Sequence, residues 1–147
     1  MICRELLPMK VHGCSEEDSV EQCAGLMRDS NVGFIPILDD QNRVVGAVTD
    51  RDLAIRVVAA GRPLSTKVRE VMTPPPLLTC RVDEDLREVE ARMGHAGKSR
   101  VIILDEDERC VGVLSLSDIA RVEEQARAGQ LLHDVAERES HAPVLEP

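Results

Sequence analysis

The stretch Gly46-Ala47-Val48-Thr49-Asp50-Arg51-Asp52 returns later in the chain as Gly112-Val113-Leu114-Ser115-Leu116-Ser117-Asp118. In both copies an apolar run typical of a β-strand ends on a hydroxyl residue, Thr49 or Ser115. A carboxylate, Asp52 or Asp118, follows three positions later, where a helical pattern begins. We therefore predict two equivalent strand-to-helix corners.

The two corners belong to an ungapped internal repeat. When residues 8–54 are aligned with residues 74–120, at an offset of 66, eleven positions are identical. An ungapped register of that length indicates a duplicated unit. Because a unit of about 60 residues buries little surface by itself, we expect the two copies to share one core.

Each copy has the pattern of a β-α-β-β-α unit. Acidic clusters at 16–18 and 83–85 are placed in the first turn of a helix, where negative charge is favourable. Two short strands follow, at 34–38 and 44–48 in the first copy and at 101–104 and 110–114 in the second. Polar turns separate them, which predicts two hairpins. A second helix is predicted from residue 51 to about 60, and from 117 to about 128, where Gly129 would end it.

The predicted fold class is therefore α/β (α+β), with two β-α-β-β-α repeats packed as a pseudo-twofold pair. We place the first repeat at 1–66, the second at 67–128 and a C-terminal helical tail at 129–147. The composition of the tail is helical up to Glu139. A frayed end and a dimer-contact helix both fit the tail.

The charge and composition limit the kinds of partner. The net charge of −9 is spread along the chain, which opposes binding to duplex nucleic acid because phosphate contacts need clustered Lys and Arg. A single Phe, with no Trp or Tyr, argues against stacking on single-stranded bases. No apolar run approaches the ~20 residues that span a bilayer, and no secretory signal opens the sequence. We expect a cytoplasmic protein that does not bind membranes.

The cysteines and histidines form no catalytic or metal-binding motif. The five cysteines have no C-x-x-C spacing and are expected to pack as reduced thiols. We find no Ser-His-Asp set, Cys-His pair or HExxH sequence, so we expect no enzymatic activity and no metal requirement. A redox-responsive dimer acting through Cys3 is kept as a minor alternative.

The doubled pattern of Gly, two apolar residues, Thr or Ser and an Asp three positions on resembles the tandem cystathionine-β-synthase (CBS) domain pair, or Bateman module. The resemblance covers about residues 2–125 and includes Val71-Met72-Thr73-Pro74 and Ile35-Pro36-Ile37. It implies regulatory binding of an adenosine-containing ligand such as AMP, ADP, ATP, NAD or S-adenosylmethionine. It also implies a homodimer. Because no effector domain fits in the remaining residues, we expect the output to act on an effector protein in trans.

The resemblance also implies the residues of two binding sites. Asp52 and Asp118 would hold ribose hydroxyls, and Thr49 and Ser115 would face phosphate. Segments before the first helix and at the start of the middle strand would line the base: Val11, His12, Gly13, Cys14, Gly33, Phe34 and Ile35 in the first site, and Leu78, Thr79, Cys80, Ser99, Arg100 and Val101 in the second. The family usually has Thr or Ser at the position of Gly13, so the first base pocket departs from the pattern.

The chemistry of the corners supports this interpretation and also a simpler one. An ionised carboxylate accepts both hydroxyls of a vicinal diol, and a helix N-terminus favours phosphate. However, Thr49 with Asp52, and Ser115 with Asp118, also fit the helix capping box, which needs no ligand. The alternative function is therefore a ligand-free dimeric scaffold in which these corners are only helix caps.

Overall fold

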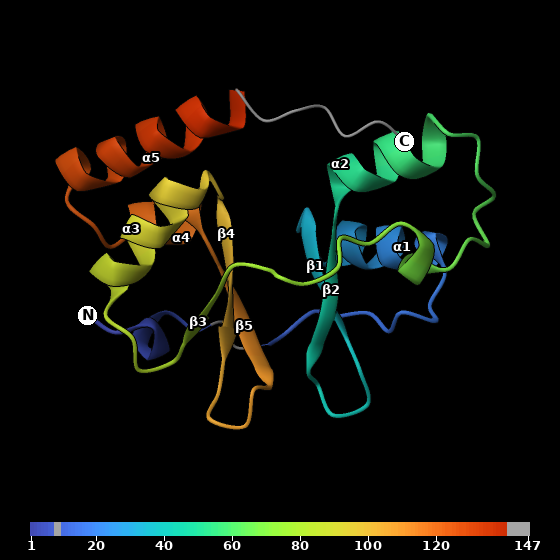
Figure 1. Ribbon diagram of the computed structural model, residues 1–147, viewed down its shortest axis with the longest axis horizontal. Coiled ribbons are helices and arrows are strands. Elements are labelled where there is room, and N and C mark those ends of the chain that lie inside the picture. Colours follow the sequence, from blue (N-terminus) through green and yellow to red (C-terminus); the bar gives the residue numbers. More distant parts are fainter. Residues whose placement is uncertain (8–9, 141–147) are drawn as a thin grey trace. The chain divides into compact units, whose positions relative to one another are not determined.

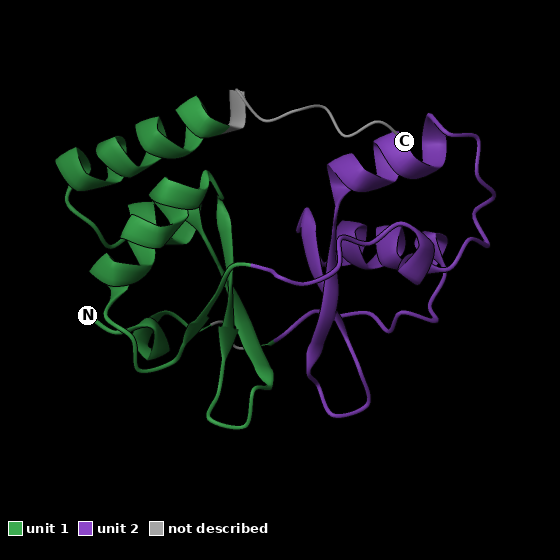
Figure 2. Cartoon of the chain, in the orientation of Figure 1, with its two compact units in different colours: residues 1–10, 78–145 green, residues 11–77, 146–147 purple. Residues whose placement is uncertain are grey.

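The computed structural model describes residues 1–7 and 10–140, and these residues form two compact units (Figures 1 and 2). Of the described residues, unit 1 contains 1–7, 10 and 78–140, and unit 2 contains 11–77. Within the described residues no helix is both long and apolar enough to cross a bilayer.

Each sequence repeat opens with a short lead-in segment that contains a 3-10 helix, and each lead-in lies in the compact unit formed mainly by the other repeat. The N-terminal 3-10 helix η1, Cys3–Leu6, packs in unit 1, where Cys3 N–H donates to Glu84 O at 3.1 Å and Arg4 N–H donates to Val82 O at 2.8 Å. The corresponding 3-10 helix η3, Val68–Glu70, packs instead in unit 2. Boundaries at residues 66 and 128 describe the sequence repeats, and as domain boundaries they stay a prediction.

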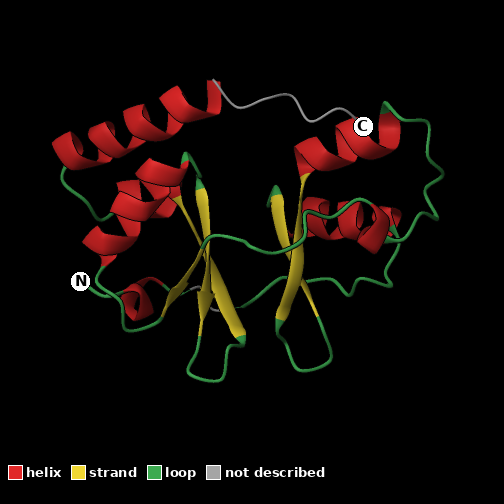
Figure 3. Ribbon diagram, viewed as in Figure 1, coloured by secondary structure: helices red, strands yellow, loops and turns green. Residues whose placement is uncertain are grey.

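Unit 2 is built on an antiparallel hairpin of β1, Phe34–Leu38, and β2, Val44–Thr49. The segment before the first helix joins this hairpin through a single parallel bridge from Cys14 to Ile37. Helix α1, Val20–Ser30, and the short helix α2, Asp50–Leu53, with its π-helical continuation η2, Ala54–Val58, accompany the hairpin in unit 2 (Figure 3). Its core includes Cys23, Ile35, Ile37, Val48 and Val68.

Unit 1 has a three-stranded sheet in the order β3-β4-β5. Strand β3, Thr79–Arg81, pairs in parallel with β4, Arg100–Leu104, which pairs antiparallel with β5, Cys110–Ser115. Together with the unit 2 hairpin, this confirms the predicted mixed α/β class and the two strand hairpins. The helices of unit 1 are α3, Leu86–Ala96, α4, Leu116–Ala120, and α5, Gln125–Ser140.

Both first helices begin later than the acidic clusters suggested. Helix α1 starts at Val20 behind the cap residue Ser19, whose side chain accepts from Gln22 N–H, and α3 starts at Leu86 behind the cap residue Asp85. The acidic residues at 16–18 therefore precede the first turn of α1, whereas Asp85 is itself the N-cap of α3. An N-cap residue satisfies an otherwise unpaired helix N–H.

The last predicted helix is also different in the structure. It breaks after Ala120, and α5 then runs from Gln125 through Gly129 to Ser140. Glycine inside a helix costs about 1 kcal/mol relative to alanine, which is less than burying a Leu and a Val side chain contributes. Leu131 and Val135 of α5 lie in the unit 1 core at 5% and 2% exposure. The tail therefore begins as a packed helix, and the part of the tail from residue 141 lies outside the described residues.

Candidate functional site: two capped strand-to-helix corners

The first corner is a complete capping box at the junction of β2 and α2. Thr49 N–H donates to Asp52 Oδ2 at 2.9 Å, and Asp52 N–H donates to Thr49 Oγ1 at 3.1 Å. Both residues are half-buried. Within the described chain, no hydrogen bond or ion pair involves the other carboxylate oxygen, Asp52 Oδ1. One oxygen of this acid is therefore committed to the fold, and the other is available to an added donor.

The second corner repeats this box at the junction of β5 and α4, with one more bond. Ser115 N–H donates to Asp118 Oδ2 at 2.8 Å, and Asp118 N–H donates to Ser115 Oγ at 3.1 Å. The Ser115 hydroxyl also donates to Asp118 Oδ2 at 2.7 Å. On the outer side, Asp118 Oδ1 lies 3.8 Å from the guanidinium of Arg121. The serine hydroxyl here is therefore already paired with the acid that follows it.

The start of each middle strand lies directly beside its corner. Phe34 pairs with Thr49 in the β1–β2 ladder, and Arg100 pairs with Ser115 in the β4–β5 ladder. The residue before each strand is also tied to the first helical residue: Asp50 N–H donates to Gly33 O at 2.9 Å. In the second copy Leu116 N–H donates to Ser99 O, also at 2.9 Å. The structure thus brings Gly33 and Phe34 to corner one, and Ser99 and Arg100 to corner two.

The segments before the first helix lie along the same middle strands. Cys14 N–H donates to Pro36 O at 3.2 Å, and Ile102 N–H donates to Leu78 O at 3.1 Å. Thr79 and Cys80 pair with the middle strand of unit 1 as part of β3. His12, in unit 2, has its ring nitrogen Nδ1 3.1 Å from Ser30 Oγ. These segments are therefore neighbours of the strand that leads to each corner.

The predicted base-lining residues divide into buried and accessible groups. Four of them have core side chains, so only their backbone could face a ligand: Cys14, Cys80, Ile35 and Val101. The others are half-buried or exposed: Val11, His12, Gly13, Gly33, Phe34, Leu78, Thr79, Ser99 and Arg100. A base would therefore contact small, polar or aliphatic groups with Phe34 as the one aromatic ring.

The arginines near the corners have different roles. Arg56 Nη1 donates to Val71 O at 2.7 Å, so this guanidinium is already bound to the backbone of unit 2. Arg100 Nη1 donates to the neighbouring Ser99 O at 3.0 Å. Arg51 is exposed on α2 and carries its charge one residue before the corner carboxylate.

Cys3 lies in the core of unit 1 rather than at an accessible end. It is 0% exposed, and its sulfur is 3.8 Å from the sulfur of Cys80. The hydrogen bond that the Cys80 thiol donates to Cys3, together with burial, raises the pKa of Cys80. This position does not favour the intermolecular disulfide that the redox alternative requires, because a buried thiol is inaccessible to a second chain.

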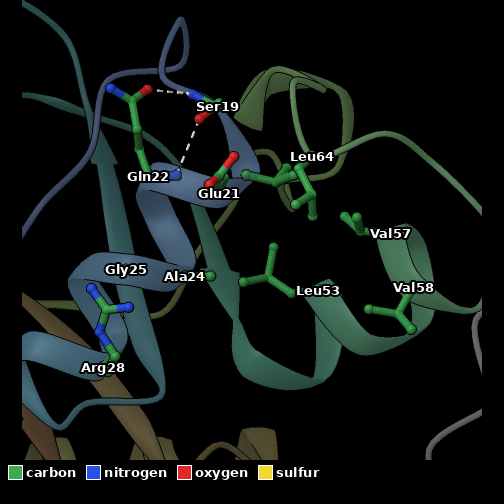
Figure 4. A pocket seen from close by; sticks show the side chains of 11 residues that line it. Ser19, Glu21, Gln22, Ala24, Gly25, Arg28, Leu53, Val57, Val58 and Leu64 are labelled. Carbon is green, nitrogen blue, oxygen red and sulfur yellow. Dashed lines mark hydrogen bonds between the residues drawn. The ribbon is translucent and has the colours of Figure 1, made fainter.

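Sequence reasoning did not identify a groove in unit 2 between α1 and the α2–η2 helix (Figure 4). Its volume is about 620 Å³, and Ala24 of α1 faces Leu53 and Val57 across it. Val58 and Leu64 lie on its rim and are 76% and 57% exposed. An amphipathic helix pattern indicates that one face is apolar but does not indicate that the face is left uncovered.

Within residues 1–7 and 10–140, no three His, Cys, Asp or Glu side chains gather closely enough to hold a metal ion.

This chain belongs to the CBS domain family, which matches residues 4–59 and 68–124, once in each repeat. It is therefore a tandem CBS-pair protein. It is 34% identical over 136 residues to the uncharacterized protein YlbB of Bacillus subtilis (strain 168), covering 91% of this chain and 90% of YlbB.

Two solved structures share the fold. The CBS domain protein PAE2072 from Pyrobaculum aerophilum, complexed with AMP, has a TM-score of 0.75 at 22% identity, covering 90% of this chain and 99% of PAE2072. Hypoxic Response Protein I, with two coordinated zinc ions, has a TM-score of 0.74 at 27% identity, covering 84% of this chain and 100% of that protein.

Proposed function

We propose that this protein is a regulatory CBS pair that binds an adenosine-containing nucleotide at one or both corners and signals, as a homodimer, to an effector protein in trans. The observation that carries the proposal is the duplicated corner, in which a carboxylate, a hydroxyl residue and the start of the middle strand adjoin in the same register. The AMP complex of PAE2072, which has the same fold, supports the ligand class. The proposal involves no catalytic step and no resident metal.

The capping boxes do not prevent binding at these corners. Corner one keeps Asp52 Oδ1 for a ribose hydroxyl while Oδ2 still accepts from the backbone. A cap contributes about 0.5–2 kcal/mol, whereas a Kd of ~1–100 µM corresponds to roughly 5.5–8 kcal/mol of binding free energy. The contribution of a cap is therefore small beside the binding free energy of such a ligand. Corner one is the better candidate, because at corner two Ser115 and Arg121 both already engage Asp118.

The homodimer in this proposal needs an apolar surface that a second copy can cover. The rim of the unit 2 groove supplies exposed Val58 and Leu64 beside apolar Leu53 and Val57. We propose this groove as the surface at which two copies associate, since burying apolar area is the main driving force for association. The alternative function, a ligand-free scaffold, uses the same groove and treats the corners as caps alone.

Isothermal calorimetry of the protein against AMP, ATP, NAD and S-adenosylmethionine tests the nucleotide proposal. The informative variant is Asp52→Asn, because its amide oxygen can still accept from Thr49 N–H while the charge that would hold a diol is removed. Asp118→Asn makes the same test at corner two, and exposed Asp40→Asn is the matched control.

Nucleotide binding that Asp40→Asn retains and that Asp52→Asn or Asp118→Asn weakens at least tenfold supports the proposal. A saturating ligand at 100-fold excess over Kd should also raise the free energy of unfolding by about 2.7 kcal/mol. No heat from any nucleotide at millimolar concentration would favour the scaffold function instead.

A further inference from the structure

A buried carboxylate in unit 1 lies outside both corners. Glu90 of α3 is 8% exposed. Its Oε2 accepts from Arg127 Nη2 at 2.9 Å, whereas Oε1 is buried with no hydrogen-bond partner in the described part of the chain. An unpaired buried carboxylate oxygen is costly, so this group is expected either to gain a proton or to leave its environment.

A second carboxylate shares the same arginine. Glu123, in the turn between α4 and α5, pairs with Arg127 Nη1 at 2.9 Å. The side chains of Glu90, Glu123 and Arg127 are 9%, 12% and 32% exposed. Two acids thus converge on one base in a mostly buried cluster, which leaves one negative charge unbalanced when both acids are ionised.

Among the described residues, Arg127 is the one cation that faces Glu90. The charged groups that face it are Glu123 from the turn and Arg127 from α5. Asp134, farther along α5, lies against Gly94, and Asp118 of α4 is beside Arg121. Burial and the neighbouring Glu123 carboxylate raise the pKa of Glu90 to about 7, despite the opposing effect of Arg127. A protonated Glu90 donates to Glu123, which relieves the repulsion between the two acids.

The cluster lies where α5 attaches to α3. Arg127 is in the first turn of α5, and Leu131 and Val135 follow it into the unit 1 core. Gly94 of α3 and Gly97, which caps the C-terminus of α3, give α5 room, because an added Cβ on Gly97 would meet Arg138 Cβ at 2.4 Å. The helix is therefore held by an apolar stripe with the acidic cluster at one end of it.

Comparison with the first repeat shows that the acid pair lies on the face of unit 1 that α5 covers. At the offset of 66, Glu90 and Glu123 correspond to Ala24 and Val57, and these two line the uncovered groove of unit 2. Arg28, which also lines that groove, corresponds to Gly94, against which α5 packs. In unit 1, α5 thus covers the face that unit 2 leaves open, and the acid pair occurs only on the covered face.

We propose that Glu90, Glu123 and Arg127 form a proton-sensitive latch that holds α5 over this face of unit 1 and releases α5 as the pH rises. When the latch carries its extra proton, the acids share a hydrogen bond and Arg127 joins α5 to α3. Loss of the proton leaves two adjacent carboxylates with one guanidinium. Release exposes Glu90 to water, where its charge is stable, and uncovers an apolar face equivalent to the unit 2 groove.

The direction of the pH dependence follows from the linkage between protonation of Glu90 and docking of α5. Glu90 has a higher pKa when α5 is docked than the ordinary value of ~4.3 that applies once it is exposed. Protonation therefore favours docking. Its stabilisation of the docked helix is complete below about pH 4.3 and is lost as the pH rises through about 7. Between about pH 6 and pH 8.5 the equilibrium constant for release should increase roughly tenfold.

Hydrogen exchange read by mass spectrometry on the whole protein tests this inference. Protection factors, corrected for the intrinsic pH dependence of exchange, are compared at the two pH values for peptides from α5 and from β4–β5. We expect α5 to lose roughly tenfold in protection at the higher pH while β4–β5 does not change.

Two variants sharpen the test. Glu90→Gln mimics the protonated acid and should keep α5 equally protected at both pH values, whereas Glu124→Gln, a neighbouring exposed acid, should behave as the unmodified protein. The proposal is overturned if Glu90→Gln keeps the original pH dependence, or if α5 protection does not respond to pH. Parallel loss of protection in β4–β5 would also overturn it, since that result means unfolding of unit 1 rather than release of α5.

Discussion

Asp118 Oδ2 accepts from both the backbone N–H and the hydroxyl of Ser115, at 2.8 and 2.7 Å, whereas among the described residues Asp52 Oδ2 accepts from the backbone N–H of Thr49 alone. Two corners that match in sequence therefore differ in how firmly each carboxylate is bound. We propose that the corner with the less engaged acid is the one that binds the ligand, and that the other contributes more to stability.

This difference predicts unequal costs for removing the two acids. Each hydrogen bond contributes about 0.5–1.5 kcal/mol, so Asp118→Ala should lower the free energy of unfolding by about 1 kcal/mol more than Asp52→Ala. Chemical denaturation followed by circular dichroism measures both, because the chain has no Trp or Tyr for fluorescence. Exposed Asp40→Ala serves as control, with a change within about 0.5 kcal/mol. Equal losses at the two corners would contradict the geometry.

Gly129 should be replaceable with a gain in stability. It lies inside α5, and an added Cβ would meet no atom within 4 Å. Gly129→Ala should therefore raise the free energy of unfolding by about 0.5–1 kcal/mol, because alanine loses less backbone entropy in a helix. Gly97→Ala is the contrasting variant, since Gly97 has a φ of 65° and Arg138 occupies the space of its Cβ. Denaturation curves that show no gain for Gly129→Ala would mean that α5 is not helical at this position.

The cysteines should be unreactive in the folded protein. All five are buried, and burial raises the pKa of Cys110. We expect Ellman's reagent to modify less than one thiol quickly in native protein and all five in guanidinium chloride. Oxidant should likewise leave mobility on a non-reducing gel unchanged. Rapid labelling of Cys3, mapped by mass spectrometry, would restore the redox alternative.

Much of the fold and the position of the corners could be predicted from the sequence, because duplication makes weak local signals reinforce each other. The hairpins were predicted because turn residues and apolar runs recur at one offset, so that Phe34 and Arg100 occupy equivalent positions. The exchange of lead-in segments was not predictable, since the local sequence around Cys3 does not determine whether this residue packs beside Cys80 or within its own repeat. The sequence predicts a helix end at Gly129 because local propensity gives no weight to the tertiary burial of Leu131.

The site was predicted less completely than the fold. Sequence spacing placed Thr49 beside Asp52 but did not distinguish a cap from a ligand contact, because both uses need the same atoms. It also could not reveal that Ile35 and Val101 point into the core. The sequence does not distinguish Glu90 from other glutamates, because a glutamate on a helix is ordinarily solvated, and its burial depends on the tertiary packing of α5 and Arg127 against α3.

The unusual position of Glu90 also predicts how the stability of the whole protein depends on pH. Because the acid is protonated more readily in the folded chain, its contribution to stability is present below about pH 4.3 and is lost as the pH rises through about 7. The variant Glu90→Gln cannot ionise at this position, so it does not show this loss of stability at high pH. The free energy of unfolding of Glu90→Gln minus that of the original protein should therefore be about 1.4 kcal/mol higher at about pH 8.5 than at about pH 6, the equivalent of a tenfold change in the unfolding equilibrium. Denaturation at the two pH values measures this difference, with Glu124→Gln as the exposed control. A constant difference between Glu90→Gln and the original protein would mean that Glu90 does not take up a proton on folding.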